Sequence, residues 1–333
     1  MKRIFLKQPA RLNSWEIGEA DRISCEVADT AHPRNYVLVD SEKEADIIVV
    51  LESCSFKCHN DLDYYRELIE LWTSERIALV LNYEDGPPGV LPGLYTSLEA
   101  HKFDRNIHLS WPHMRFPNER ILDTGDACKL DYDYIFSFMG SCSHPLRREI
   151  FALYEHGSKK DGVFVQEVKR WYNHDENEKE SYINKIKKSA FVLCPRGIAS
   201  YTHRIIETLA LGRVPVVVAD DWVPFSIPER DYFIRISESD VGSIDKILTN
   251  EVFKYGELWK KSTVVYNKYF EQSRRYSIAF DRLVALSDRM PNYVNRDYLL
   301  TRLRSSEFYK MNGWLFSQRL RSLLKRRWRQ LRG

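Results

Sequence analysis

The stretch SAFVLCPRGIASYTHRIIETLALGRVPVVVADDWVPF, residues 189–225, constrains the fold of this chain more than any other segment. Residues 189–195 and 214–219 are apolar runs of the kind that form buried strands. Between them, residues 204–211 have the spacing of a helix, and Gly212 follows as a residue suited to end it. A strand, a helix and a second strand within so few residues predict a βαβ-like unit of a parallel sheet.

The helix within this stretch carries polar residues that its packing does not explain. Ser200 or Thr202 is placed to cap it. At 100° per residue, Arg204 and Glu207 fall on the side opposite an apolar face made of Ile205, Ile206, Leu209 and Ala210. A cation in the first turn opposes the helix dipole, so a bound phosphate would compensate Arg204, and Glu207 could accept hydrogen bonds from ribose. The spacing leaves a solvated Arg204–Glu207 ion pair equally open.

The rest of the chain repeats the alternation of strands and helices. A chain of 333 residues is too long for one ordinary core and suits two α/β domains. Residues 45–51, 77–83 and 134–140 are further apolar strand patterns, and a polar stretch precedes the last of them. We therefore expect an α/β chain of two Rossmann-like domains, with its parts at residues 1–130, 131–290 and 291–333.

The charge is concentrated at the end of the chain. The net charge is +3, yet residues 315–333 hold seven Lys or Arg and no acid, so that +3 − 7 = −4 remains upstream. The body therefore lacks the basic character of a nucleic-acid binder. Residues 313–333 have apolar and aromatic residues near one helical face and cations on the other, which favours binding to an anionic membrane surface. The alternative is a helix packed back on the N-terminal domain.

Several observations bear on location and metals. No apolar run is long enough to span a bilayer, and the N-terminus lacks the apolar core of a secretory signal, which favours a cytoplasmic protein. Six scattered cysteines favour reduced thiols. The ligand pattern at Cys54–His59 is incomplete, and Asp131-Tyr132-Asp133 precedes a strand as an acidic linker would. We therefore expect no metal site.

Residues 189–225 resemble the signature of the exostosin-like glycosyltransferases, family GT47. The departures from the signature are Thr202 for Ser, Thr208 for Ala, Arg213 for Cys and one residue missing before Pro224. The residues in step are Ser189, Phe191, Leu193, Pro195, Gly197, Arg204, Glu207, Gly212, Pro215, Val216, Asp220 or Asp221, Pro224 and Phe225.

A second segment, YIFSFMGSCSHPLRREIF at residues 134–151, is similar to the first strand, loop and Arg-bearing helix of the same family's donor domain. Gly140 lets the backbone come close to a ligand, and Ser141 follows it in the loop. Pro145 suits the first turn of a helix, and Arg147 could reach a phosphate.

The resemblance implies a GT-B fold with an N-terminal acceptor domain, a C-terminal nucleotide-sugar domain and reaction in the cleft. It also implies inversion at the anomeric carbon without a metal or other cofactor. Retaining GT-B enzymes with a Glu-x7-Glu motif would need a second Glu eight residues from Glu207. Those positions are Ala199 and Pro215, which agrees with an inverting enzyme. The donor is expected to be a nucleotide-diphosphate sugar, UDP ahead of GDP. Its expected binding residues are Gly140, Ser141, Arg147, Arg196, Gly197, Thr202, Arg204 and Glu207.

An inverting transferase needs a base to take the acceptor proton. Carboxylates or His after strands of the N-terminal domain are the candidates: Glu52, Glu84 or Asp85, and His113. Each also fits as a loop or capping residue, and the sequence does not rank them.

The family resemblance and the basic tail together suggest a bacterial-type member without a membrane anchor. It would extend an oligosaccharide or lipid-linked glycan for lipopolysaccharide or capsule, in the cytoplasm and peripheral on the inner face of the membrane. The alternatives are a non-catalytic nucleotide-sugar or membrane-surface binding module, and a nucleic-acid binder that uses the tail, which nothing in the body supports.

Overall fold

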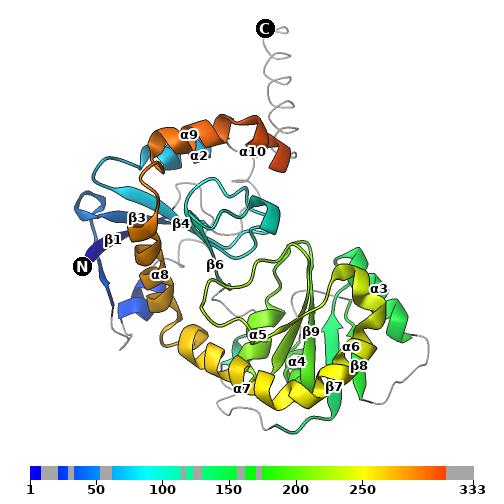
Figure 1. The fold of residues 1–333 in the computed structure, drawn as a ribbon. Helices are drawn as coiled ribbons and strands as arrows, with labels where there is room; N and C mark the ends of the chain where they lie inside the picture. Colours follow the sequence, from blue (N-terminus) through cyan, green and yellow to red (C-terminus); the bar gives the residue numbers. More distant parts are fainter. Residues whose placement is uncertain are drawn as a thin grey trace. The chain divides into compact units, whose positions relative to one another are not determined.

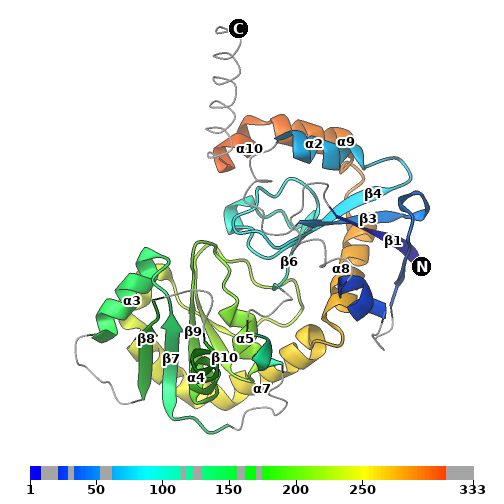
Figure 2. The same ribbon diagram turned by 180° about the vertical axis from the view of Figure 1, so that it is seen from behind.

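The computed structural model describes residues 1–8, 22–28, 34–52, 62–113, 118–122, 130–155, 162–169 and 175–312. The chain forms two compact units, and each is built on one parallel β-sheet with helices (Figures 1 and 2). This confirms the predicted α/β fold with two Rossmann-like domains, which is the architecture of the GT-B class.

The first unit contains a six-stranded sheet in the order β2-β1-β3-β4-β5-β6, with every neighbouring pair parallel. The chain passes from β1 to one neighbour and then crosses to the other, so the strand order reverses between β1 and β3. The strands are β1 Lys2–Lys7, β2 Tyr36–Leu38, β3 Ile47–Glu52, β4 Ile77–Asn82, β5 Gly93–Tyr95 and β6 His108–Ser110, with 3-10 turns η1 Glu42–Glu44 and η3 Ala100–Lys102.

Helices from both ends of the chain cover this sheet. Helix α2 (Leu62–Glu70) packs the apolar side chains of Tyr65, Leu68 and Ile69 into the core with β3 and β4. After the second unit the chain returns as α8 (Arg275–Arg289), α9 (Arg296–Arg304) and α10 (Ser306–Met311). Residues of the last two helices enter the same core: Leu299, Leu303 and Phe308. Helices α9 and α10 therefore pack back on the first unit.

The second unit contains a five-stranded parallel sheet in the order β11-β10-β9-β7-β8. Its strands are β7 Tyr134–Gly140, β8 Val163–Glu167, β9 Ser189–Pro195, β10 Val214–Val218 and β11 Ile234–Arg235. Its helices are α3 Pro145–Glu155, α4 Glu176–Lys187, α5 Arg204–Ala210, α6 Ile244–Glu251 and α7 Tyr255–Val265. Short turns complete it: η4 Glu119–Ile121, η5 Glu238–Ser243, η6 Val252–Lys254 and the π-helical η7 Tyr266–Phe270.

The sequence patterns locate the central strands of this unit well. Both β7 and β9 have the bounds that their apolar runs predict, and every residue of β9 and β10 is buried. Their side chains form the core with helices on the sheet, including Phe136, Phe191, Val216, Ile150 and Leu248. The strand order reverses between β7 and β9, because β7 leads to β8 on one side and β9 lies on the other.

The unit boundaries differ from the predicted residues 130 and 290. The second unit is Pro112–Arg275, and the first combines Met1–Trp111 with Tyr276–Gly333. Turn η4 belongs to the second unit because Arg120 forms an ion pair with Glu176 at 2.5 Å. Helix α8 belongs to the first because the Phe280 ring lies 5.6 Å from that of Tyr36.

Arg213, which departs from the family signature, is buried and links three segments of the second unit by hydrogen bonds. Its Nη1 donates to the Tyr255 hydroxyl at 2.6 Å, and its Nη2 donates to the Asp131 carbonyl at 2.9 Å and to the Lys187 carbonyl. It thereby joins the start of β7, the end of α4 and the start of α7. The longer side chain therefore stabilises the local packing.

Within the described ranges, no helix has the length and apolarity needed to cross a membrane. The predicted amphipathic tail, residues 313–333, lies outside the described residues. The same holds for the cysteine-rich segment Cys54–His59.

Replacing Arg213 with Met tests the contribution of these hydrogen bonds to stability. The substitution keeps most of the apolar stem but leaves a buried hydroxyl and two carbonyls without their donor, so Arg213→Met should lower the free energy of unfolding by about 3 kcal/mol. Urea denaturation measures the change. Arg230→Met, at an exposed position of the same unit, is the control and should change it by less than about 0.5 kcal/mol. Equal stability of the two variants would contradict the role assigned to Arg213.

Candidate functional site

The candidate site lies in the second unit at the carboxyl ends of β7 and β9, the neighbouring strands between which the strand order reverses (Figure 1). In open parallel sheets ligands bind at such a reversal, because the loops that follow the two strands diverge there. The two segments with family resemblance supply these two strands. Gly140 is the last residue of β7, and Pro195 is the last of β9.

Arg204, the first residue of α5, extends its guanidinium to the end of β7. Its Nη2 donates to the Met139 carbonyl at 2.6 Å, and its Cζ lies 4.8 Å from the centre of the Phe138 ring and 5.7 Å from that of Tyr182. A Cβ at Gly140 would lie only 2.8 Å from Nη2. Glycine at the end of β7 therefore gives this guanidinium its space.

Two further nitrogen atoms of Arg204, Nε and Nη1, are buried and have no hydrogen-bond partner among the described residues. The whole side chain is buried, with 8% of the residue exposed. Buried N–H groups without an acceptor are costly, by about 1 to 3 kcal/mol each and more for a charged group. These atoms are therefore available to an acceptor that the protein does not itself supply.

A second arginine, Arg147 of α3, lies beside the first and is also buried. It donates to three main-chain carbonyls: that of Arg196 at 2.9 Å, that of Pro195 at 3.1 Å and that of Ser141 at 3.3 Å. These bonds tie the loop after β7 to the loop after β9. Burial, and then the charge of Arg204, lower the pKa of Arg147 to about 9, so it stays cationic at neutral pH.

Neither guanidinium group forms an ion pair with a described carboxylate, and Glu207 acts on Arg204 only from beyond ion-pair distance. Among the described residues, no carboxylate lies within 4 Å of a side-chain nitrogen of either arginine. Aromatic rings and carbonyl dipoles surround them instead, and the charge of one lowers the pKa of the other. Two buried cations of this kind make a preformed site for an anion with oxygen acceptors.

Glu207 lies one turn along α5 and is 5% exposed. The hydroxyl of Tyr182, on α4, donates to its Oε2 at 2.5 Å. Burial raises the pKa of this carboxyl group. No ion pair joins Glu207 to Arg204 in the described structure, so the solvated pair that the spacing left open does not form.

The start of α5 differs from its prediction. The helix begins at Arg204 after His203, and no side chain caps it. Thr202 accepts a hydrogen bond from the Ile205 amide through its carbonyl, at 3.1 Å, and the buried Ser200 hydroxyl has no partner among the described residues. The cationic side chains, and not a capped helix terminus, therefore define the site.

The other predicted donor residues divide into two groups. Gly197 gives space to Arg147, since a Cβ there would lie 3.2 Å from its Nη2, and Ser141 accepts from that arginine through its carbonyl. Arg196 differs from the prediction. Its Nη1 lies 3.7 Å from both Asp221 and Glu238, so its charge is already compensated.

The three base candidates differ in the unit they belong to and in their burial. His113 belongs to the second unit and not to the N-terminal domain, a correction to its predicted place. Its ring lies 4.7 Å from that of His203, whose pKa burial and then His113 lower to about 3. Asp85 is exposed in the loop after β4. Glu52 is buried at the end of β3, and burial followed by the charge of Glu84 raises its pKa to about 8.

Tyr182 is the site residue that the sequence analysis missed. It lies on α4, in a segment that reads as polar because most of its other residues are charged or amidic. Asp175 and Glu178 form a capping box at the start of this helix, which is a recognisable sequence signal. The position of Tyr182 over Glu207 depends on packing between α4 and α5 and has no comparable signal.

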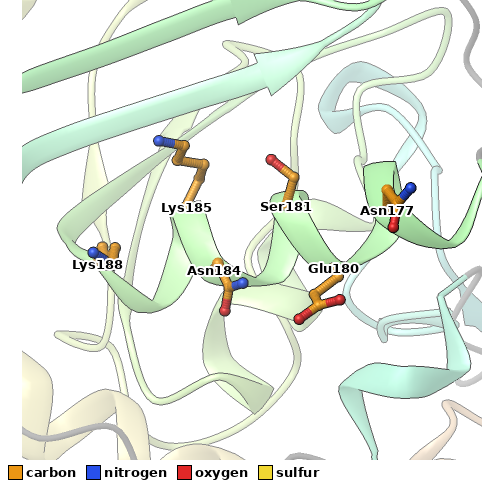
Figure 3. A pocket seen from close by; sticks show the side chains of 6 residues that line it. All are labelled: Asn177, Glu180, Ser181, Asn184, Lys185 and Lys188. Carbon is orange, nitrogen blue, oxygen red and sulfur yellow. The ribbon is translucent and has the colours of Figure 1, made fainter.

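A hollow along the exposed side of α4 carries no site. Figure 3 shows it lined by side chains of this helix and of the residue after it: Asn177, Glu180, Ser181, Asn184, Lys185 and Lys188. None of the residues around the two buried guanidinium groups lines it. Its polar groups belong to a solvated helix surface.

Acidic residues that resemble metal ligands have protein partners. Asp133, in the predicted acidic linker, accepts from Lys188 at 2.8 Å, and Asp220 accepts from the Glu238 amide at 3.1 Å. Among the described residues, no three His, Cys, Asp or Glu side chains gather as metal ligands would.

Residues 94–250 match the family model described as the Exostosin GT47 domain. The match runs from β5 of the first unit to α6 of the second and includes Arg147, Tyr182, Arg204 and Glu207.

The curated relatives include plant proteins. The Oryza sativa subsp. japonica "Probable glucuronosyltransferase GUT1" is 38% identical over 74 residues, which are 21% of this chain and 18% of that protein. The rice "Probable glucuronosyltransferase Os03g0107900" is 28% identical over 201 residues, which are 54% of this chain and 44% of that protein. The Arabidopsis thaliana "Probable beta-1,4-xylosyltransferase IRX10" is 37% identical over 73 residues, which are 21% of this chain and 18% of that protein. This chain thus spans less than half the length of these relatives.

Solved structures that resemble the chain include an alpha1,3-fucosyltransferase, with a TM-score of 0.42 and 13% identity over 92% of this chain and 91% of that one. A glycosyltransferase from Rickettsia africae has a TM-score of 0.46 and 11% identity over 87% of this chain and 99% of that one.

The buried carboxyl of Glu207 predicts a pH-dependent stability. A folded pKa raised above the unfolded value stabilises the fold below the unfolded pKa, and this contribution is lost as the pH rises through the folded pKa. Glu207→Gln keeps an oxygen for the Tyr182 hydroxyl but cannot ionise. It should therefore be more stable than the wild type at pH 7 and lose this advantage at pH 4.

Thermal unfolding across this pH range measures the effect. Glu180→Gln, which changes an exposed carboxyl on α4, is the control and should follow the wild-type curve. A Glu207→Gln curve parallel to that of the wild type would show that Glu207 ionises without penalty.

Proposed function

We propose that this protein, which carries an exostosin GT47 domain in residues 94–250, is an inverting glycosyltransferase. It moves a sugar from a nucleotide-diphosphate sugar, UDP-linked in the first instance, to a hydroxyl of a glycan. The single observation that carries the proposal is the pair of buried guanidinium groups, Arg204 and Arg147, without a carboxylate partner at the strand-order reversal. A diphosphate supplies the charge and the oxygen acceptors that this site lacks.

The proposed donor site assigns a distinct task to each residue. The two unpartnered nitrogen atoms of Arg204 donate to phosphate oxygens. Arg147 contributes its charge while its carbonyl contacts hold the two loops in place. Glu207 accepts from ribose hydroxyls, and Tyr182 keeps its carboxylate oriented.

The chemical step is a displacement at the anomeric carbon. The acceptor oxygen forms a bond to this carbon while the bond from the carbon to the phosphate oxygen breaks, and the electron pair leaves with the diphosphate. Fixed guanidinium groups stabilise the charge that develops on the leaving group, because they are oriented before the reaction and shielded from water. Because they supply the positive charge, we propose that no metal is required. A base takes the proton of the acceptor hydroxyl.

The identity of the sugar and its acceptor extends this proposal. The relatives are named as probable glucuronosyltransferases and a probable xylosyltransferase, so glucuronate and xylose are the first sugars to test. We propose an oligosaccharide or lipid-linked glycan acceptor in cell-surface polysaccharide assembly. A non-catalytic nucleotide-sugar binding module is the second candidate, since Arg204 and Glu207 would serve binding alone. Turnover separates the two.

Calorimetry with UDP and GDP tests the donor site directly. UDP should bind, and Arg204→Met should weaken its binding about 10- to 100-fold, because a hydrogen bond between charged groups contributes about 1.5 to 3 kcal/mol. Glu207→Gln should weaken it less, since an amide oxygen still accepts one hydroxyl. Arg148→Met, at the exposed position beside Arg147 on α3, is the control and should bind as the wild type does. Absence of binding by either nucleotide to the wild type would refute the proposal.

The basic tail supports a proposed peripheral location on the inner face of a membrane. Residues 315–333 hold seven cations, each of which contributes about 1 kcal/mol near an anionic surface. Deleting residues 313–333 should lower sedimentation with phosphatidylserine vesicles more than tenfold, and salt should weaken wild-type binding. Phosphatidylcholine vesicles are the control for charge. Undiminished sedimentation of the shortened chain would exclude the tail as the membrane contact.

A further inference from the structure

His144 is the residue before α3, and neither the family signature nor the proposed function uses it. It belongs to the short loop that joins β7 to α3. Its carbonyl accepts from the Arg147 amide at 3.0 Å and from the Arg148 amide at 3.3 Å, so it forms part of the first turn of the helix. Residues three apart in a helical turn lie on the same side. The His144 ring is therefore a neighbour of the Arg147 side chain, and the two interact electrostatically.

The loop after β9 lies against the same turn. A Cβ at Gly197 would be 3.3 Å from the Ser143 hydroxyl and 3.2 Å from Arg147 Nη2. Arg147 also donates to two main-chain carbonyls of that loop. The residue before His144 and the arginine three residues after it are thus both close to the loop after β9. This places His144 at the strand-order reversal of the second unit, where the candidate donor site lies.

Only one of the two ring nitrogen atoms of His144 is used within the protein. The Leu146 amide donates to its Nδ1 at 3.3 Å. A neutral imidazole that accepts at Nδ1 carries its proton on Nε2. Among the described residues, no group accepts a hydrogen bond from this Nε2. The N–H is therefore available to a ligand that offers an oxygen acceptor.

The main-chain amides of the turn are already used. Pro145, the first residue of α3, has no N–H. The Leu146 amide donates to the His144 ring, and the next two amides donate to the His144 carbonyl. The imidazole, and not the terminus of the helix, is therefore the donor that this turn offers to a ligand.

The charges around His144 favour a neutral ring beside an anion. The charged groups that face it are Arg196 after β9, Glu238 of η5 and Arg147 of α3. Burial, and then the charge of Arg196, lower its pKa; Glu238 opposes this, and Arg147 adds to it. Among the described residues, no carboxylate lies within 4 Å of the His144 ring. A neutral N–H adds a hydrogen-bond donor beside the guanidinium groups without adding a further cation.

We propose that His144 is a further donor-binding residue, whose Nε2–H donates to an oxygen of the diphosphate bound by Arg204 and Arg147. This inference rests on the proposed function and involves the second unit alone. Arg204 donates from the start of α5, and His144 donates from the turn before α3. The diphosphate is thus held by side chains that follow both of the strands between which the strand order reverses.

The competing interpretation is that His144 only caps α3. Its Nδ1 accepts from the Leu146 amide, as the side chain of a capping residue does. Asn, Ser or Asp would serve this purpose at least as well, since they are the preferred capping residues. Capping alone gives no task to Nε2, so the two interpretations predict different effects when only one of the two nitrogen atoms is replaced.

Two substitutions separate the two ring nitrogen atoms. His144→Asn provides an amide oxygen in place of Nδ1 and still caps the helix, but it has no group in place of Nε2. His144→Gln brings an amide N–H near the Nε2 position and leaves the Leu146 amide without its acceptor. Arg148→Met, at an exposed position of the same turn, is the control.

Calorimetry with UDP measures the Kd of each full-length variant. His144→Asn should weaken UDP binding about tenfold, because a hydrogen bond to a charged group is lost. It should unfold at the same urea concentration as the wild type, since the cap remains. His144→Gln should recover most of the affinity, and Arg148→Met should bind UDP as the wild type does. Capping alone predicts the reverse order, with His144→Asn equal to the wild type in affinity.

NMR of the chain with 15N-labelled histidine follows the ring itself. The His144 signal is the one that disappears in either variant. A bound diphosphate favours the protonated imidazole, so the pKa of His144 should rise by about 1 when UDP binds. A ring that serves only as a cap would keep its pKa. This measurement uses the wild type and therefore decides the question even if one of the variants is poorly folded.

Each outcome supports or overturns the inference. A Kd of His144→Asn within twofold of the wild type would overturn it, and so would a His144 pKa that UDP does not move. Either result leaves the proposed function intact if the wild type binds UDP and Arg204→Met weakens that binding. A wild type that binds neither UDP nor GDP would refute the donor site, and with it this inference.

Discussion

The hydrogen bond from the Arg204 guanidinium to the Met139 carbonyl places a full positive charge at the end of a buried strand. Removing a charge from water is expensive, and a nearby carboxylate is the usual remedy. This site provides aromatic faces, main-chain carbonyls and a second guanidinium instead. The arrangement is therefore poorly compensated by the protein alone, and an anion with oxygen acceptors is the kind of ligand that would compensate it.

Small residues at the strand ends make this arrangement possible. Gly140 and Gly197 lie where a Cβ would approach the guanidinium groups of Arg204 and Arg147, respectively. The apolar strands β7 and β9 fix the positions of these glycines, since their side chains form the core of the unit. The core thus positions the site, and the loops only have to pass close to it. Arg196 shows the contrast, because two carboxylates lie near it and compensate its charge.

Each of the two sheets gathers polar groups at its carboxyl edge, with opposite chemistry. The second unit holds the buried guanidinium groups of Arg147 and Arg204, and the first holds the buried carboxyl groups of Glu52 and Glu84. The rest of each strand is apolar and buried.

The sequence by itself determined the two-domain α/β architecture and the bounds of β7 and β9, and it singled out Arg204 and Glu207 as polar residues that packing does not explain. Apolar runs and helical spacing are local properties, and they act within a few residues of where they are read. Only the tertiary structure decided that Tyr182 holds Glu207, that Arg196 is neutralised, that His113 belongs to the second unit, and that Glu52 and not Asp85 is buried. Each of these depends on contacts between segments far apart in the chain. Burial and the charge of a neighbour, which set a pKa, arise from those contacts and leave no trace in the spacing of residues.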